Sequence, residues 1–174
     1  MSLEPLLAAS PVIQIHAFAA IVAFGLGGWV LFRRKKGDAH HRALGKLWVA
    51  LMVIVAVSSL FIWTIRLWGP FSPIHLISIA TLVGLYRAVQ YARRRQIKAH
   101  MNLMRGLYLG ALVVAGVFTF MPGRIMNQVA FGPDGADPAE SAIFALVLAI
   151  CAVIGLALAN RRRLARWCRT LAAA

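Results

Sequence analysis

The chain has 174 residues, of which 61% are hydrophobic, and its mean hydropathy is +0.76. This apolar content exceeds that of ordinary soluble domains, so it excludes that class and predicts an all-α integral membrane protein. The formal net charge is +14. The basic residues are gathered in blocks between or after apolar runs, which is typical of membrane topology, and we expect no nucleic acid partner.

Five apolar runs predict five transmembrane helices. They cover residues 11–32, 47–68, 74–92, 107–121 and 143–159. Each approaches the roughly 20 residues that a helix needs to cross a bilayer. The fourth run is short, and an extension over 104–126 would give it the required length.

The basic blocks also predict an orientation. Residues 33–46, 93–105 and 161–169 would all lie on one side if five helices alternate in direction. The positive-inside rule then puts the N-terminus outside and the C-terminus in the cytoplasm of a bacterial inner membrane. The lipid bilayer is the expected partner, with anionic lipids near the basic blocks.

Local signals fix several helix ends. Ser10-Pro11 and Ser72-Pro73 each read as an N-cap followed by a proline at the first helical position, and Asp38 is a suitable N-cap for the second helix. The resulting single membrane domain comprises a first helical hairpin (11–68), a second hairpin (72–126), an outer loop (127–141), a fifth helix (142–160) and a basic cytoplasmic tail (161–174).

The two hairpins resemble each other. A shift of 59 residues superposes His16 on His75 and His41 on His100, while His40 falls on an alanine. Such self-similarity indicates a duplicated supersecondary unit, which here predicts a four-helix bundle. His41 is therefore the repeated residue of the tandem pair, and His40 is an incidental neighbour.

The repeated histidines predict two transverse pairs. His16 and His75 lie near the outer ends of helices one and three, whereas His41 and His100 open helices two and four on the inner side. The two levels should stand about 20 Å apart. Imidazole is a common axial haem ligand and bundle cores often hold cofactors, so each pair is a candidate ligand set for the iron of one haem b.

Cations and small residues accompany these histidines. We expect Arg42 and Arg105 to neutralise haem propionates at the inner level, and Arg66 and Arg124 to do so at the outer level. Gly27 lies on the face of helix one that carries His16 and leaves room there for a macrocycle or a close helix. Gly25 and Gly84 point away from their histidines and read as helix-packing sites.

Three stretches resemble a known family. HRALGKLWV, GPFSPIHLISIATLVGLYRA and VFTFMPGRIMNQVAFG are similar to segments of a bacterial membrane family, domain of unknown function 2306, over roughly residues 10–132. This resemblance implies a small polytopic membrane protein and brings no activity. The layout of the histidines also resembles cytochrome b561, whose four core helices supply two bis-histidine haem sites, although the spacings differ and no ascorbate motif is present.

Three functions remain open. The first is a diheme b-type cytochrome, an oxidoreductase-like protein that moves electrons across the membrane or exchanges them with a quinone or respiratory partner. The second is a cofactor-free accessory or assembly subunit whose histidines make hydrogen bonds between helices. The third is a small transporter. The duplicated units favour this function, whereas the parallel orientation of the repeats disfavours it. Self-association is compatible with all three.

Overall fold

The computed structural model describes residues 2–63 and 73–132, together with residues 134, 135, 137, 139, 140, 142, 143 and 146. Over these residues the chain is helical and contains no strand. The predicted fifth helix and basic tail lie almost entirely outside the described residues, and Arg66 lies wholly outside them.

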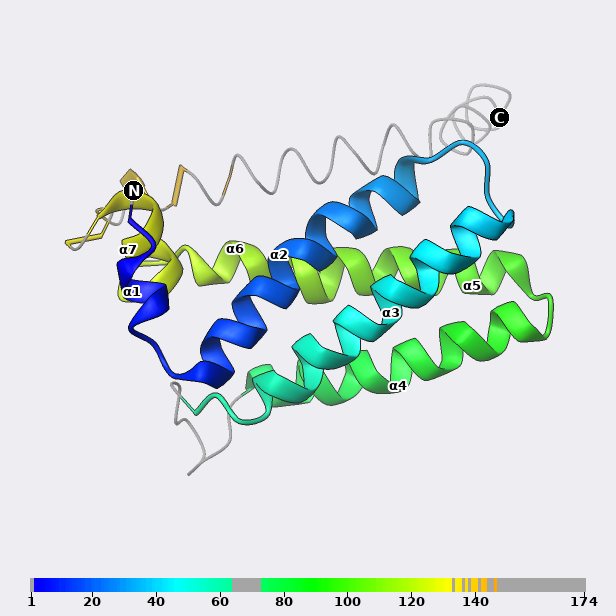
Figure 1. Cartoon of the computed structure of the whole chain (residues 1–174), viewed down its shortest axis with the longest axis horizontal. Coiled ribbons are helices and arrows are strands. Elements are labelled where there is room, and N and C mark those ends of the chain that lie inside the picture. Colours follow the sequence, from blue (N-terminus) through cyan, green and yellow to red (C-terminus); the bar gives the residue numbers. More distant parts are fainter. Residues whose placement is uncertain are drawn as a thin grey trace, which may run out of the picture.

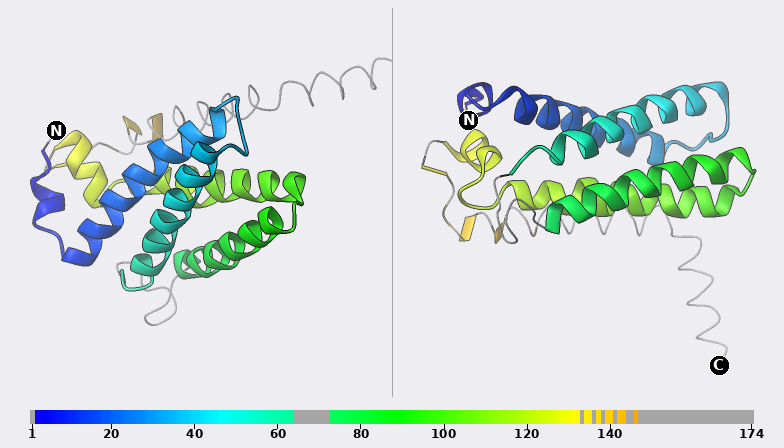
Figure 2. Two further views of the ribbon diagram at one scale, coloured as in Figure 1. Left: turned by 45° about the vertical axis from the view of Figure 1, so that its right-hand side comes forward. Right: turned by 90° about the horizontal axis from the view of Figure 1, so that it is seen from below.

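Four long helical segments run antiparallel and form the body of the molecule (Figure 1). They are α2 (Pro11–Phe32), α3 (Ala39–Ser59), α4 (Pro73–Arg93) and a continuous helix made of α5 (Ile97–Leu107), η1 (Tyr108–Val114) and α6 (Ala115–Thr119). The α2–α3 hairpin lies over the hairpin formed by α4 and α5 (Figure 2). Two short helices, α1 (Glu4–Leu7) and α7 (Ile125–Phe131), pack against each other at the end of the bundle near the N-terminus.

Three of these segments are long and apolar enough to cross a membrane: α2, α3 and the helix Ile97–Thr119. The α4 helix is as long as α3, but it carries His75, Arg87 and Gln90 and is more polar than α2 and α3. Large apolar side chains lie exposed along the bundle, among them Ile21, Phe24 and Val83. Such surfaces suit contact with lipid.

Several predicted helix ends are confirmed. Helix α2 begins at Pro11 after Ser10, α4 begins at Pro73, and Asp38 caps α3 by accepting a 2.8 Å hydrogen bond from the backbone N–H of His41. The fourth apolar run marks only the later part of its helix, which begins at Ile97, close to the start expected from His100. Its first turns carry Lys98, His100 and Arg105 beside apolar residues, so hydropathy alone does not detect them.

The predicted outer loop contains a helix. Residues 125–131 form α7, and the side chain of Asn127 is fully buried there with its Nδ2 donating to the Phe120 carbonyl at 2.7 Å. Opposite α7, Leu6 of α1 is also buried. The two short helices thus cover one end of the bundle, which we call the α1 end.

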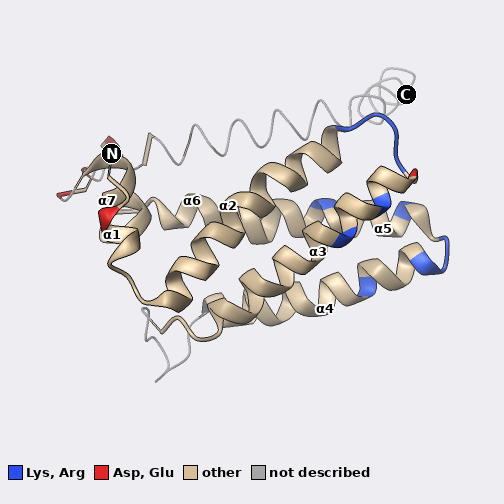
Figure 3. Cartoon of the chain, viewed as in Figure 1, with Lys and Arg blue, Asp and Glu red and all other residues tan. Residues whose placement is uncertain are grey.

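Lysine and arginine gather at the opposite end, which we call the basic end (Figure 3). Here α2 joins α3 and α4 joins α5, as the charge pattern of the sequence predicts. The core between the two ends includes Ala23, Trp48, Met52, Leu85 and Tyr108.

Candidate functional site: two levels of histidines

The four repeated histidines lie on helices that occupy opposite corners of the bundle. Helices α2 and α4 both pack against α3, and both contact the continuous helix that includes α5 and η1. His16 of α2 and His75 of α4 therefore share one diagonal of the bundle, and His41 of α3 and His100 of α5 share the other.

The His16 side chain joins α2 to α3 at the α1 end. Its Nδ1 lies 3.0 Å from the carbonyl oxygen of Val55 and 3.1 Å from Oγ of Ser58. A carbonyl oxygen only accepts hydrogen bonds, so Nδ1 carries the proton and donates it. This tautomer leaves the lone pair on Nε2, the nitrogen that commonly binds a metal when Nδ1 is held by a carbonyl.

Buried polar groups surround this level. His75 is 3% exposed. Ser59 of α3 and Ser78 of α4 are also buried, and their hydroxyls lie 2.5 Å apart. One hydroxyl donates to the other, and the hydroxyl that accepts donates in turn to a carbonyl of its own helix, which is Ala56 for Ser59 or Ile74 for Ser78. Side chains from α2, α3 and α4 thus form one polar region inside the α1 half of the bundle.

His100 joins α5 to α4 at the basic end. Its Nδ1 lies 2.9 Å from the carbonyl oxygen of Ala88, so this imidazole too donates from Nδ1 and keeps its lone pair on Nε2. His41 and His100 lie in the first turns of α3 and α5, so both belong to the basic end. Nδ1 of His41 is buried and makes no hydrogen bond with the described residues. His40, in contrast, is exposed.

The hydrogen bonds fix the separation of the two levels. Ala88, the partner of His100, lies 13 residues after His75 on α4, and Val55, the partner of His16, lies 14 residues after His41 on α3. At about 1.5 Å of rise per residue, each separation amounts to about 20 Å. This agrees with the spacing expected from the sequence.

Aromatic side chains fill the bundle between the levels. Trp48 Nε1 donates to the Ala23 carbonyl at 2.9 Å, and the Tyr108 hydroxyl donates to the Phe24 carbonyl at 3.2 Å. A Cβ atom at Gly27 would lie 2.7 Å from Cδ2 of Tyr108, so Gly27 is a close-packing site. The room expected beside Gly27 is thus taken up by aromatic rings of α3 and η1.

The other two glycines differ from each other. A Cβ atom at Gly84 would lie 2.8 Å from Leu107, which confirms Gly84 as a packing site. At Gly25 no described atom lies within 4 Å of an added Cβ, so the packing role expected there stays a prediction. Among the described residues, Gly25 lies on an exposed part of α2.

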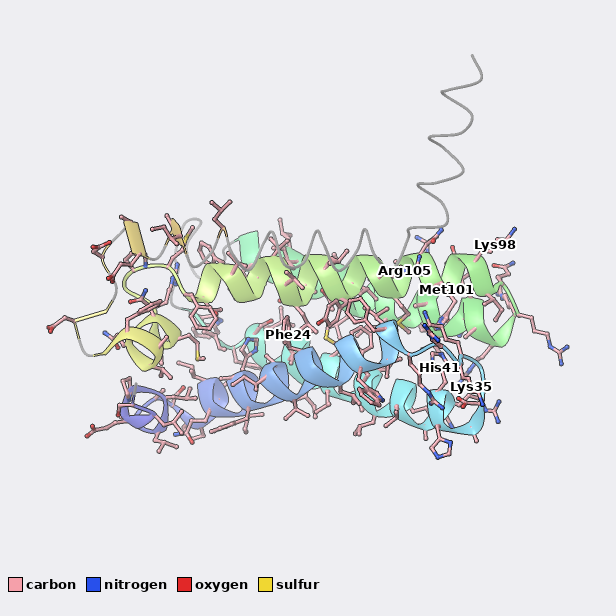
Figure 4. All side chains as sticks on the ribbon, turned by 90° about the horizontal axis from the view of Figure 1, so that it is seen from above. Phe24, Lys35, His41, Lys98, Met101 and Arg105 are labelled. Atoms are coloured by element: carbon pink, nitrogen blue, oxygen red, sulfur yellow. The ribbon has the colours of Figure 1, made fainter. Side chains whose placement is uncertain are left out.

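The cations expected near the histidines make contacts of their own. Arg42 donates to the Gly37 carbonyl at 2.8 Å, and the Arg124 guanidinium lies 4.7 Å from the centre of the Phe118 ring. Figure 4 shows His41 with Met101 and Arg105 at the basic end. Partial desolvation, and then the charge of Arg105, lower the pKa of Lys36 below its ordinary value.

Comparison with protein families matches residues 13–160 to a family described as a predicted membrane protein, domain of unknown function 2306 (DUF2306). The chain belongs to this family. No curated protein and no solved structure matches this DUF2306 protein. Among the described residues there is no cluster of three or more His, Cys, Asp or Glu that could hold a metal ion, so a metal here would depend on pairs of ligands.

Proposed function

We propose that this DUF2306 protein is a diheme b-type membrane cytochrome, with His16 and His75 as axial ligands at the α1 end and His41 and His100 at the basic end. The observation that carries the proposal is the shared tautomer of His16 and His100. One histidine of each pair donates from Nδ1 to a backbone carbonyl of the neighbouring helix and so presents Nε2 with its lone pair.

Three further observations support the two-level arrangement. The members of each pair lie on diagonal helices, and the levels are about 20 Å apart. The second helices of the two hairpins also have corresponding ends. A shift of 59 residues moves the bounds of α3 to 98–118, and the helix that spans α5 to α6 covers 97–119. Bound haem would supply single-electron transfer, while the residues would provide ligation, orientation and low polarity.

The basic side chains near His41 suit the propionates of a haem at that level. Arg105 lies on α5 five residues after His100, and Arg42 follows His41 directly. Arg124 and Arg66 would serve the opposite level. With the basic end in the cytoplasm, electrons would pass between the two faces of a bacterial inner membrane, and a quinone or respiratory protein would be the exchange partner.

A cofactor-free accessory subunit is the second candidate. It is favoured by the hydrogen bonds at the α1 end, where His16 bonds Val55 and Ser59 bonds Ser78 across helix boundaries. These bonds tie α2, α3 and α4 together without a ligand. The two functions differ in one property, which is the presence of haem.

The absorption spectrum of the purified protein tests the proposal. We expect the oxidised and dithionite-reduced protein to show reduced α-bands and about two haems per chain. His16→Ala and His75→Ala should each lower the haem content by about half and give matching spectra. His41→Ala and His100→Ala should remove the other component.

His40→Ala is the matched control, because His40 adjoins His41 but is exposed, and we expect its spectrum to be unchanged. Elution volume and far-UV circular dichroism of each variant separate haem loss from unfolding. A colourless wild-type protein expressed with ample haem would favour the accessory subunit. Matched loss in His16→Ala and His41→Ala would contradict the transverse pairing and would mean that each hairpin builds its own site.

A further inference from the structure

An open groove lies between α4 and α5. Its volume is about 680 Å³, and its lining includes the small residues Ala80, Gly84 and Ala99 and the polar residues Arg87, Tyr91 and Asn102. Two of its lining residues, Arg87 and Ala99, are the chain neighbours of Ala88 and His100, which form the hydrogen bond described above. Neither Ala88 nor His100 lines the groove. It is therefore a different site from the histidine pairs.

The polar residues of the groove are suited to an anion. Arg87 is exposed, and its guanidinium donates a 3.4 Å hydrogen bond to the hydroxyl of Tyr91. No Asp or Glu from the described part of the chain lines the groove. The guanidinium thus keeps most of its donors for a ligand, and Arg matches the geometry of phosphate oxygens well.

The position of Arg87 along α4 sets the level of that anion. Arg87 precedes Arg93, the last residue of α4, by six residues, or about 9 Å of helix. Its long side chain can reach from there toward the headgroup region at the basic end. On the other side of Arg87 the groove continues over Gly84, Ala80 and Val83, which form an apolar trough next to the packing contact between Gly84 and Leu107.

We infer that this groove binds one anionic phospholipid, with the phosphate at Arg87 and Asn102 and an acyl chain along Gly84 and Ala80. A quinol is a poorer match, because it must release protons when it is oxidised, and neither a carboxylate nor an imidazole of the described residues lines the groove. The inference does not depend on haem binding.

Native mass spectrometry of the detergent-solubilised full chain tests this site. The protein is mixed with phosphatidylglycerol or with phosphatidylcholine of the same acyl chains, and the retained lipid is counted. We expect the wild type to retain phosphatidylglycerol preferentially. Arg87→Gln should lower that retention about fivefold, the effect of removing one cation near an anionic lipid, whereas Arg87→Lys should keep most of the preference.

Arg93→Gln is the matched control, since Arg93 is an exposed arginine of the same helix that does not line the groove. Its retention of phosphatidylglycerol should equal that of the wild type. Ala80→Phe should also reduce retention, because the ring would fill the apolar trough while leaving Arg87 in place.

Several outcomes would overturn the inference. Equal losses in Arg87→Gln and Arg93→Gln would show that only the overall surface charge matters. Equal retention of the two lipids would remove the role of an anionic headgroup. Displacement of the lipid by inorganic phosphate would assign a free anion, and preferential retention of decylubiquinone would assign a quinone.

Discussion

The α1 end and the basic end of the bundle bury their histidines in different ways. At the α1 end, His16 and the serines 58, 59 and 78 form hydrogen bonds that join three helices in the interior. At the basic end, His100 bonds a single neighbouring helix, and the turn that precedes His41 carries the Arg33–Asp38 ion pair. The α1 end is therefore held by neutral hydrogen bonds, whereas the basic end depends on charges that salt and pH can change.

The aromatic centre separates the two ends. Trp48 and Tyr108 each donate to a backbone carbonyl of α2, and the rings of Phe24 and Tyr108 stack with their centroids 5.7 Å apart. A tight centre should allow one level to be altered without loss of the other. The haem-loss experiment requires that a variant at one level leaves the other level intact. A variant that disrupts the aromatic packing should affect both levels.

The largest effect is expected from Gly27→Ala. The new methyl group would meet the side chains of Trp48 and Tyr108, so we expect a loss of about 1–3 kcal/mol in unfolding free energy. Thermal unfolding in detergent, followed by tryptophan fluorescence, measures the change. Gly25→Ala is the matched control, because no described atom lies within 4 Å of its Cβ, and its Tm should not fall. Equal losses in both variants would indicate helix flexibility and not packing.

A smaller effect is expected from Ser59→Ala at the α1 end. This variant removes the hydroxyl that contacts Ser78, but Ser78 keeps its bond to the Ile74 carbonyl, so the cost should be about 1 kcal/mol. A double-mutant cycle with Ser78→Ala measures the coupling between α3 and α4. Additive losses would mean that this contact does not join the helices, and the contrast between the two ends would then rest on His16 alone.

Local signals made the levels of the histidines predictable. Ser10-Pro11, Pro73 and Asp38 fix helix ends through interactions within a few residues, so the depth of His16, His75 and His41 follows from residue counting. The position of the basic turns at one end of the bundle follows in the same way from charge and apolar length.

Tertiary contacts made other features unpredictable. Helices α1 and α7 form because Leu6 and Asn127 become buried where two distant segments meet. The segment around α7 is rich in Gly and Pro, so its sequence does not predict a helix there. The π-helical turn η1 likewise lies within an ordinary apolar run. The carbonyl partners of His16 and His100, which fix their tautomers, come from backbone positions that no residue type marks.

The groove at Arg87 escaped the sequence analysis for a similar reason. A single arginine in an apolar run is visible in the sequence, but its association with Asn102 requires α4 and α5 to lie side by side. Arg87 is also not part of the repeat that relates the histidines, because a shift of 59 residues puts Gly28 at the position of Arg87.

The smallest effect is expected from Asp38→Asn at the basic end. The backbone N–H of His41 lowers the pKa of Asp38, desolvation offsets part of this, and the Arg33 guanidinium, 2.5 Å away, lowers it further. A lowered carboxyl pKa stabilises the fold above the ordinary value of 3.8 and loses this effect as the pH falls through the shifted pKa. Asparagine still caps α3 but carries no charge.

The Tm of the wild type should therefore exceed that of Asp38→Asn slightly at pH 7 and approach it in acid. Asp134→Asn, at an exposed carboxylate of the opposite end, provides the control, and a pH-independent difference would show that Asp38 acts through its hydrogen bond alone.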